Sequence, residues 1–157
     1  MGEAAQIPVI ADLDELYPNL DPLLENVNYL IVSRDFPERI SGKRDLREAL
    51  SWLQHRFGSQ VAAATLGTDG VLAGDGKQFC YSAAYQVPVV DTTGAGDVFH
   101  AGFIYGLLRN WPLQRNLDFA CAAAALNCTG AGARGRIQPV EKIEALVVNG
   151  QRYPAAY

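Results

Sequence analysis

The stretch Val90-Asp91-Thr92-Thr93-Gly94-Ala95-Gly96-Asp97-Val98-Phe99-His100-Ala101-Gly102 decides the fold of this 157-residue chain. It follows an apolar run over residues 85–90 that is typical of a strand. A turn of small residues then leads into an apolar run over residues 98–108, which predicts a buried helix. Gly102 and Gly106, four residues apart, predict burial and close packing of the backbone there.

The turn between strand and helix carries the residue types of an anion site. Glycine lets phosphate oxygens approach backbone amides, and a helix N-terminus adds positive potential. The turn lacks the Lys-Ser/Thr pair of a P-loop, and Phe99 stands where a dinucleotide fingerprint has its third glycine. Two interpretations of Asp97 stay open from spacing alone: a general base toward an attacking hydroxyl, or an N-cap worth about 1 kcal/mol.

The first part of the chain has the pattern of alternating strands and helices. Residues 7–13, 29–33 and 61–66 are continuously apolar, which favours buried parallel strands. Residues 45–57 carry one apolar stripe and are followed by Gly58, so they predict an amphipathic helix. Residues 21–25 predict a short helix only, because Pro18 and Pro22 interrupt the pattern.

The second part predicts hairpins and then helices. Short strands over 71–73, 78–82 and 85–90 are separated by turn residues, including Gly74-Asp75-Gly76. Helices are expected over 98–108, 117–129 and 140–147, and residues 150–157 are expected to form a frayed tail. The whole predicts one domain over residues 1–157. Its fold class is α/β: a three-layer α/β/α arrangement around a mostly parallel sheet with antiparallel hairpins at the edge.

Composition and charge argue against some classes of binding partner. Hydrophobic residues make up 49% of the chain and charged residues 19%, which is typical of a globular protein. A net charge of −4 without a basic cluster argues against a nucleic-acid partner. Three cysteines without C-x-x-C spacing predict reduced thiols, and no apolar run is long enough to span a bilayer. We therefore expect a cytoplasmic protein with no membrane partner.

The residues from Asp91 to Phe99, followed by Ala101-Gly102-Phe103, resemble the C-terminal signature of the ribokinase or PfkB family of ATP-dependent sugar kinases. The similarity runs from the first strand to Pro139 and includes Thr65-x-Gly67-x-x-Gly70 and the alanine-rich helix near residue 120. The resemblance implies a ribokinase-like sheet and transfer of a phosphoryl group from ATP to a sugar hydroxyl. It also implies Mg²⁺ and, in many relatives, a monovalent cation such as K⁺.

Carried over position by position, the resemblance implies the following roles. Asp97 is the catalytic base and contacts the sugar, and Gly94, Ala95 and Gly96 form the anion hole. His100, one turn after Asp97, is either a further substrate contact or a packed histidine without a chemical role. Thr65, Gly67 and Gly70 belong to the ATP-binding loop, with Cys121 and Ala124 near the adenine. Asp91, Thr93, Asn127, Gly130 and Gly132 match the cation positions.

The chain also departs from the family pattern. Arg136 stands where some relatives have a serine ligand of the cation. Ser33-Arg34-Asp35-Phe36 replaces the common Asn-x-x-Glu, as in ketohexokinase-like members, which moves the magnesium role to Asp35. The chain matches only the ATP-side half of the family, and the N-terminal half, which holds most of the sugar pocket, has no counterpart.

Two expectations follow from this truncation at the N-terminal side. A sheet without its flanking strands exposes an edge, which predicts pairing with another chain, for example in a homodimer. The alternative function is a non-catalytic remnant that keeps the nucleotide-binding fold without a complete sugar site.

Overall fold

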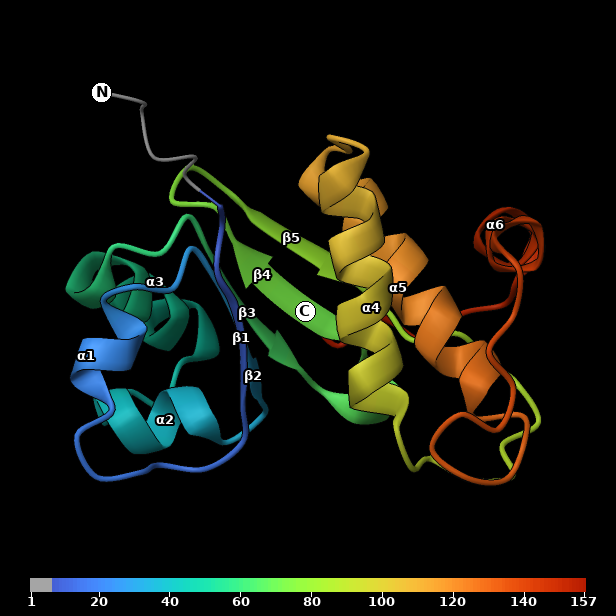
Figure 1. Cartoon of the computed structure of the whole chain (residues 1–157), viewed down its shortest axis with the longest axis horizontal. Coiled ribbons are helices and arrows are strands. Elements are labelled where there is room, and N and C mark those ends of the chain that lie inside the picture. Colours follow the sequence, from blue (N-terminus) through green and yellow to red (C-terminus); the bar gives the residue numbers. More distant parts are fainter. Residues whose placement is uncertain (1–6) are drawn as a thin grey trace. The chain divides into compact units, whose positions relative to one another are not determined.

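The computed structural model describes residues 7–157, which form two compact units (Figure 1). Among these residues, the first unit contains residues 7–64 and Ala73–Phe79, and the second contains Thr65–Leu72 and Cys80–Tyr157. Whether the two fold as one domain, as the sequence predicts, stays a prediction. Among residues 7–157, no helix combines the length and apolar character that crossing a membrane requires.

Within residues 7–157, five strands form one sheet in the order in which they occur in the chain. They are β1 (Ile10–Leu13), β2 (Tyr29–Ser33), β3 (Val61–Thr65), β4 (Val71–Gly74) and β5 (Phe79–Ser82). β1 and β2 are parallel, with Ile10 opposite Tyr29. β4 and β5 are joined by a tight turn in which the amide of Asp75 donates to the carbonyl of Gln78 at 3.2 Å. The sheet is therefore mixed, and the expected α/β class is confirmed.

The helices of the first unit are α1 (Asp21–Leu24), α2 (Phe36–Ser41) and α3 (Leu46–Phe57). α3 shows how the sequence specifies its own ends. The Asp45 carboxylate accepts from the Glu48 amide at 2.9 Å, an N-cap worth about 1 kcal/mol. Gly58 ends the helix with a φ of 77°. Between these ends Leu50 and Leu53 are fully buried, and each burial contributes about 1.5–3 kcal/mol.

Helix α2 was not predicted from the sequence. Six residues with a proline in the first turn are too short to show a helical period, although proline is compatible with a helix start. The predicted strand over 85–90 is wrong, because only an isolated antiparallel bridge between Tyr85 and Arg152 forms there. Residues 85–90 therefore run as an irregular segment after β5.

The helices of the second unit are α4 (Ala95–Leu108), α5 (Leu113–Asn127) and α6 (Val140–Asn149), and a 3-10 turn (Gly67–Asp69) links β3 and β4. α4 and α5 lie side by side (Figure 1). A Cβ added at Gly102 would lie 3.0 Å from the Cα of Ala120, and one at Gly106 would lie 2.1 Å from Oδ1 of Asn116. Both glycines thus let α5 approach α4 closely, which confirms the packing predicted from their spacing.

Candidate functional site

The start of α4 is shaped by Gly94. This residue is the N-cap, with a φ of 76°, and a Cβ there would lie 2.2 Å from the carbonyl oxygen of Ala133. Only glycine fits this position without moving the backbone. The first turn of any helix leaves amides without intrahelical acceptors, here those near Gly96 and Asp97. A Cβ at Gly96 would meet nothing within 4 Å, so the space beside these amides is open.

Asp97 lies in the first turn of α4, three residues after the N-cap. The N-cap interpretation of Asp97 is therefore wrong, because Gly94 holds that position without a side-chain cap. The Asp97 side chain is exposed, and within residues 7–157 it makes no hydrogen bond or ion pair. A carboxylate held at a helix start and open to solvent can accept a proton from an approaching hydroxyl. Its role as catalytic base stays a prediction.

His100, one turn further along α4, contacts its own helix. Its Nδ1 lies 2.8 Å from the carbonyl oxygen of Gly96, and its ring meets that of Phe99 edge to face at 5.9 Å between centroids. Both contacts fix the orientation of the imidazole. Its predicted contact with substrate stays a prediction.

Four of the residues predicted to bind a cation come together where two loops meet. The Asp91 carboxylate accepts from the amide of Thr93 at 2.9 Å and from that of Gly132 at 2.8 Å. The buried Asn127 donates to the carbonyls of Thr93 and Ala133 at 3.4 and 3.2 Å. These bonds tie the loop before α4 to the loop after α5. Gly130 lies in the second loop, where a Cβ would lie 2.6 Å from the carbonyl oxygen of Gly135.

Hydrogen bonds from the backbone amides of Thr93 and Gly132 hold the pKa of the Asp91 carboxyl below its ordinary value of about 3.9. The folded chain thus binds this proton more weakly than the unfolded chain does. The ionised Asp91 carboxylate therefore stabilises the folded state. This stabilisation is complete above about pH 4 and is lost as the pH falls through the lowered pKa of the folded state.

We expect an Asp91→Asn variant to be less stable than the wild type at neutral pH and to approach it in acid. The amide side chain cannot replace a carboxylate that accepts at both oxygens, and protonation removes the same advantage from the wild type. Urea unfolding of both proteins between pH 7 and pH 3 measures the difference. If the difference in the free energy of unfolding between the two proteins stayed constant over this range, the Asp91 charge would not be the cause of the stabilisation.

A pocket of about 400 Å³ lies within the second unit. Its lining includes all five residues predicted to bind the cofactor and two of the predicted anion hole: Thr65, Gly67, Gly70, Cys121, Ala124, Ala95 and Gly96. They come from the β3–β4 turn, the start of α4 and the middle of α5. Most of the lining is apolar, as in sites for flat organic groups. The open space beside Gly96 thus adjoins an apolar pocket.

Other lining residues were not predicted from the sequence: Tyr85, Val87, Val89, Phe99, Cys128 and Tyr153. Tyr153 comes from the C-terminal segment, for which the sequence predicts fraying. Phe99 lies in α4 and Cys128 ends α5, but the others lie in irregular segments with neighbours far away in the chain, so a periodicity search has no signal for them. The one available hint was Tyr153, an aromatic residue outside any predicted helix or strand.

Gly70 closes the β3–β4 turn against the segment after β5. Its φ is 88°, and a Cβ would lie 2.0 Å from the carbonyl oxygen of Ser82. We expect Gly70→Ala to lower the free energy of unfolding by about 2–4 kcal/mol, since backbone strain adds to a backbone collision. Gly76→Ala is the matched control. Its φ is 81° but a Cβ meets nothing within 4 Å, so only about 1–2 kcal/mol is expected. Equal losses in chemical denaturation would contradict the collision.

The three thiols are buried, and none of them forms a disulfide within residues 7–157. Burial raises the pKa of Cys121 to about 12 and also raises that of Cys128. A protonated, buried thiol reacts slowly. Two of the three thiols line the pocket, so their alkylation reports on access to it.

The predicted magnesium residue Asp35 belongs to the first unit, where it is the N-cap residue of α2 without a side-chain cap. Within residues 7–157, no three His, Cys, Asp or Glu side chains gather as metal ligands. The role of Asp35 stays a prediction.

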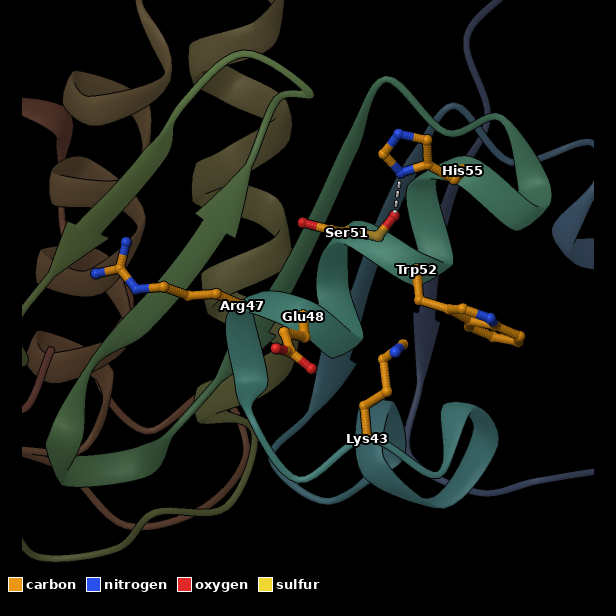
Figure 2. A pocket seen from close by; sticks show the side chains of 6 residues that line it. All are labelled: Lys43, Arg47, Glu48, Ser51, Trp52 and His55. Carbon is orange, nitrogen blue, oxygen red and sulfur yellow. Dashed lines mark hydrogen bonds between the residues drawn. The ribbon is translucent and has the colours of Figure 1, made fainter.

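A second hollow, of about 440 Å³, lies over α3 in the first unit (Figure 2). Lys43, Arg47, Glu48, Ser51, Trp52 and His55 line it. His55 is exposed, and its Nδ1 lies 2.7 Å from the carbonyl oxygen of Ser51 on the same helix. None of the predicted site residues lies here, and the side chains are those of the solvent-facing side of an amphipathic helix.

Comparison with known proteins agrees with the fold. Residues 2–139 match the profile described as "pfkB family carbohydrate kinase". A ribokinase of Lactococcus lactis is 36% identical over 123 residues, which are 78% of this chain and 39% of the relative. An ATP-dependent 6-phosphofructokinase of Thermoanaerobacterium thermosaccharolyticum is 31% identical over 124 residues, 79% of this chain and 38% of the relative.

Among solved structures, Arabidopsis thaliana ribokinase complexed with ribose and ATP is 26% identical, with a TM-score of 0.80. The match covers 90% of this chain and 47% of that one. The chain thus spans less than half the length of each of these three relatives. Since the family profile covers most of its residues, this chain belongs to the pfkB family of carbohydrate kinases.

Proposed function

We propose that this chain carries the ATP-binding and catalytic-base portion of a carbohydrate kinase, which transfers a phosphoryl group from ATP to a sugar hydroxyl. One observation carries the proposal. The open helix start at Gly94–Gly96, with Asp97 directly after it, adjoins an apolar pocket lined by Thr65, Gly67 and Gly70. The pocket suits a nucleotide base, and the helix start suits its phosphates.

In this mechanism Asp97 accepts the proton of the sugar hydroxyl as its oxygen attacks the γ-phosphorus. The bond between the γ-phosphorus and the β,γ-bridging oxygen breaks, and ADP leaves. The amides at the start of α4 stabilise the charge on the transferred group, because they point along the positive end of the helix dipole. Glycine at 96 leaves room for the phosphate oxygens.

Metal ions enter as part of the proposal. Mg²⁺ neutralises phosphate charge when it is bound with ATP, and Asp35 is the residue expected to contact it. A monovalent cation such as K⁺ would take oxygen ligands, and the Asp91 carboxylate and the carbonyls of Thr93 and Ala133 are gathered by the loop contacts described above. Carboxylate and carbonyl oxygens are the type of ligand that such a cation binds.

Two measurements on the 157-residue chain test the proposal. Calorimetry with ATP, and with NAD as a comparison, measures nucleotide binding. A coupled ADP assay with ribose and fructose 6-phosphate, which the names of the relatives suggest, measures phosphoryl transfer. ATP binding with sugar phosphorylation supports the kinase, and ATP binding without phosphorylation of any sugar supports the non-catalytic remnant. Failure to bind ATP at millimolar concentration contradicts both.

Partners are proposed on the same basis. The small-molecule partners are a sugar and ATP, and the location proposed is the cytoplasm. β1 stands at one end of the strand order, so a second copy of the chain could add a strand there. A monodisperse monomer in light scattering at high concentration would count against the homodimer.

A further inference from the structure

The C-terminal segment after α6 pairs with the segment that follows β5. The Gln86 amide donates to the carbonyl of Gln151, and the Tyr153 amide donates to the carbonyl of Ala84, both at 2.9 Å. These bonds flank the antiparallel bridge between Tyr85 and Arg152. They differ from the frayed tail that the sequence predicts. The family profile ends at residue 139, so the C-terminal side of this pairing lies outside the match.

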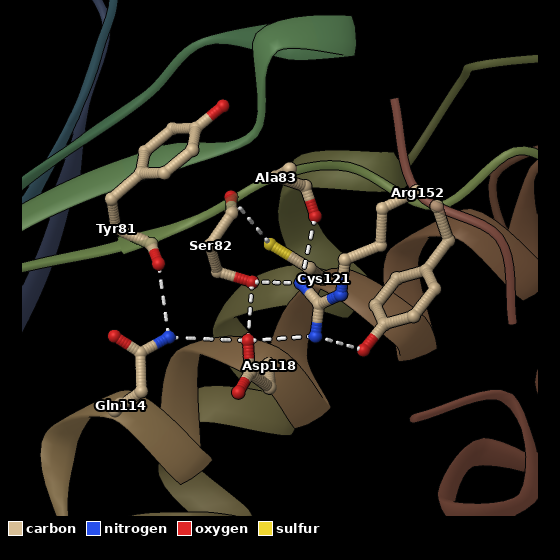
Figure 3. Close-up of polar contacts among 8 residues, drawn as sticks. Tyr81, Ser82, Ala83, Gln114, Asp118, Cys121 and Arg152 are labelled. Atoms are coloured by element: carbon tan, nitrogen blue, oxygen red, sulfur yellow. Dashed lines mark hydrogen bonds and ion pairs between the residues drawn. The ribbon is translucent and has the colours of Figure 1, made fainter. Parts of the chain in front are cut away.

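Arg152 makes the most contacts in this segment (Figure 3). Its Nη1 donates to Oγ of Ser82 at 2.8 Å and to the carbonyl of Ala83 at 3.0 Å. Its Nη2 donates to Oδ1 of Asp118 at 2.8 Å and to the hydroxyl of Tyr85. The guanidinium also lies 4.2 Å from the centroid of the Tyr85 ring. One side chain thus holds the segment after β5, helix α5 and the C-terminal segment together.

Asp118 on α5 forms a polar cluster with Arg152, Ser82 and Tyr85. Its Oδ1 accepts from Oγ of Ser82 at 2.7 Å and from Nε2 of Gln114 at 3.2 Å, besides Arg152. The side chains of Arg152 and Asp118 are 30% and 22% exposed, so water screens this ion pair less than a surface pair. Charge-assisted bonds in such a setting are stronger than neutral ones.

The cluster lies directly behind the pocket wall. Tyr85 lines the pocket and is itself a partner of Arg152, and Tyr153 is the next residue in the chain. Cys121, one turn after Asp118 on α5, also lines the pocket, and its sulfur lies 3.9 Å from the Ser82 carbonyl oxygen. Because the guanidinium donates to four protein groups and is paired with a carboxylate, it is not available as a phosphate ligand.

We propose that Arg152 is a positioning residue of the nucleotide pocket: it holds Tyr85 and the C-terminal segment in place as the wall against which the base of a nucleotide packs. This inference rests on the proposed function, since it takes ATP as the ligand. The ligand class is a nucleotide with a flat heteroaromatic base, which suits a wall containing two tyrosine rings. Arg152 acts through Tyr85 and Tyr153 and does not touch the reacting atoms.

The test compares Arg152→Met with Arg115→Met. Arg115 is a matched control, because it also forms an ion pair, with Glu144 at 3.3 Å, and lies over an aromatic ring, that of Trp111, at 4.1 Å. Neither of these partners lines the pocket. We expect Arg152→Met to weaken ATP binding at least about tenfold by calorimetry, and Arg115→Met to leave it unchanged.

Alkylation provides a second readout that needs no nucleotide. Cys121 is buried beside the cluster, with its sulfur 3.9 Å from the Ser82 carbonyl oxygen. We therefore expect a maleimide to modify it faster in Arg152→Met, while Cys80 serves as the internal reference in peptide mapping. Asp118→Asn removes only the charge of the partner and keeps the shape of the side chain, so it serves if Arg152→Met fails to fold. It should also weaken ATP binding and speed alkylation of Cys121.

The outcomes separate this inference from the proposed function. A wild-type chain that does not bind ATP overturns both. Wild-type affinity in Arg152→Met or, if that variant does not fold, in Asp118→Asn overturns the positioning role alone. Equal losses in Arg152→Met and Arg115→Met also overturn it, since they would reflect general destabilisation. Weaker ATP binding and faster Cys121 alkylation in Arg152→Met or Asp118→Asn, but not in Arg115→Met, support it.

Discussion

An Asp97→Asn variant should lose turnover by about 10²–10⁴-fold while keeping its fold and its affinity for ATP. The amide has the same shape but cannot accept a proton from the attacking hydroxyl. The Asp97 side chain is exposed, so its replacement removes no packing. Loss of a negative charge at the helix start costs only about 0.3–1 kcal/mol of stability. Steady-state kinetics measure turnover on the sugar that the wild type phosphorylates. Calorimetry measures the affinity for ATP, and thermal unfolding measures stability.

Glu141→Gln is the control for this variant. Glu141 lies in the first turn of α6, so its replacement removes an acid from a comparable position in another helix. It should change stability by a similar amount and leave turnover unchanged. Near-wild-type turnover in Asp97→Asn would exclude Asp97 as the base. An equal loss of turnover in both variants would show that helix stability, and not proton transfer, is responsible.

The two glycines at the start of α4 should respond oppositely to a single added methyl group. We expect Gly94→Ala to lower the free energy of unfolding by about 2–4 kcal/mol, because the methyl group meets the backbone of Ala133 and the residue must keep a positive φ. Gly96→Ala meets nothing within 4 Å and replaces glycine within a helix, so stability should stay equal or rise by up to about 1 kcal/mol. Urea unfolding distinguishes the two.

Nucleotide binding gives the second half of this comparison. A methyl group at Gly96 projects into the space where phosphate oxygens would approach the amides. We therefore expect Gly96→Ala to weaken ATP binding although its fold is intact. Unchanged ATP affinity in Gly96→Ala would contradict an anion site at this turn, and a large loss of stability would contradict the open space seen beside Gly96.

Local signals in the sequence predicted much of the fold. α3 carries its own apolar stripe, an N-cap at Asp45 and a stop at Gly58, and it was found within one residue of its observed start. The five predicted cofactor residues were identified by family resemblance, and all of them line one pocket. The wall formed by Tyr85 and Tyr153 was missed. Arg152, the partner of Tyr85, is 67 residues away from it in the chain, and no local pattern encodes such a contact.

The close packing of α4 on α5 has a mechanical consequence. With glycine at positions 102 and 106 the two helices approach so closely that one cannot slide past the other without a collision between Ala120 or Asn116 and the opposite backbone. α5 supplies Cys121 and other lining residues of the pocket, and α4 begins with the turn that carries Asp97. In the function proposed above, a nucleotide base bound against α5 would thereby be kept at a constant spacing from the Asp97 carboxylate at the start of α4.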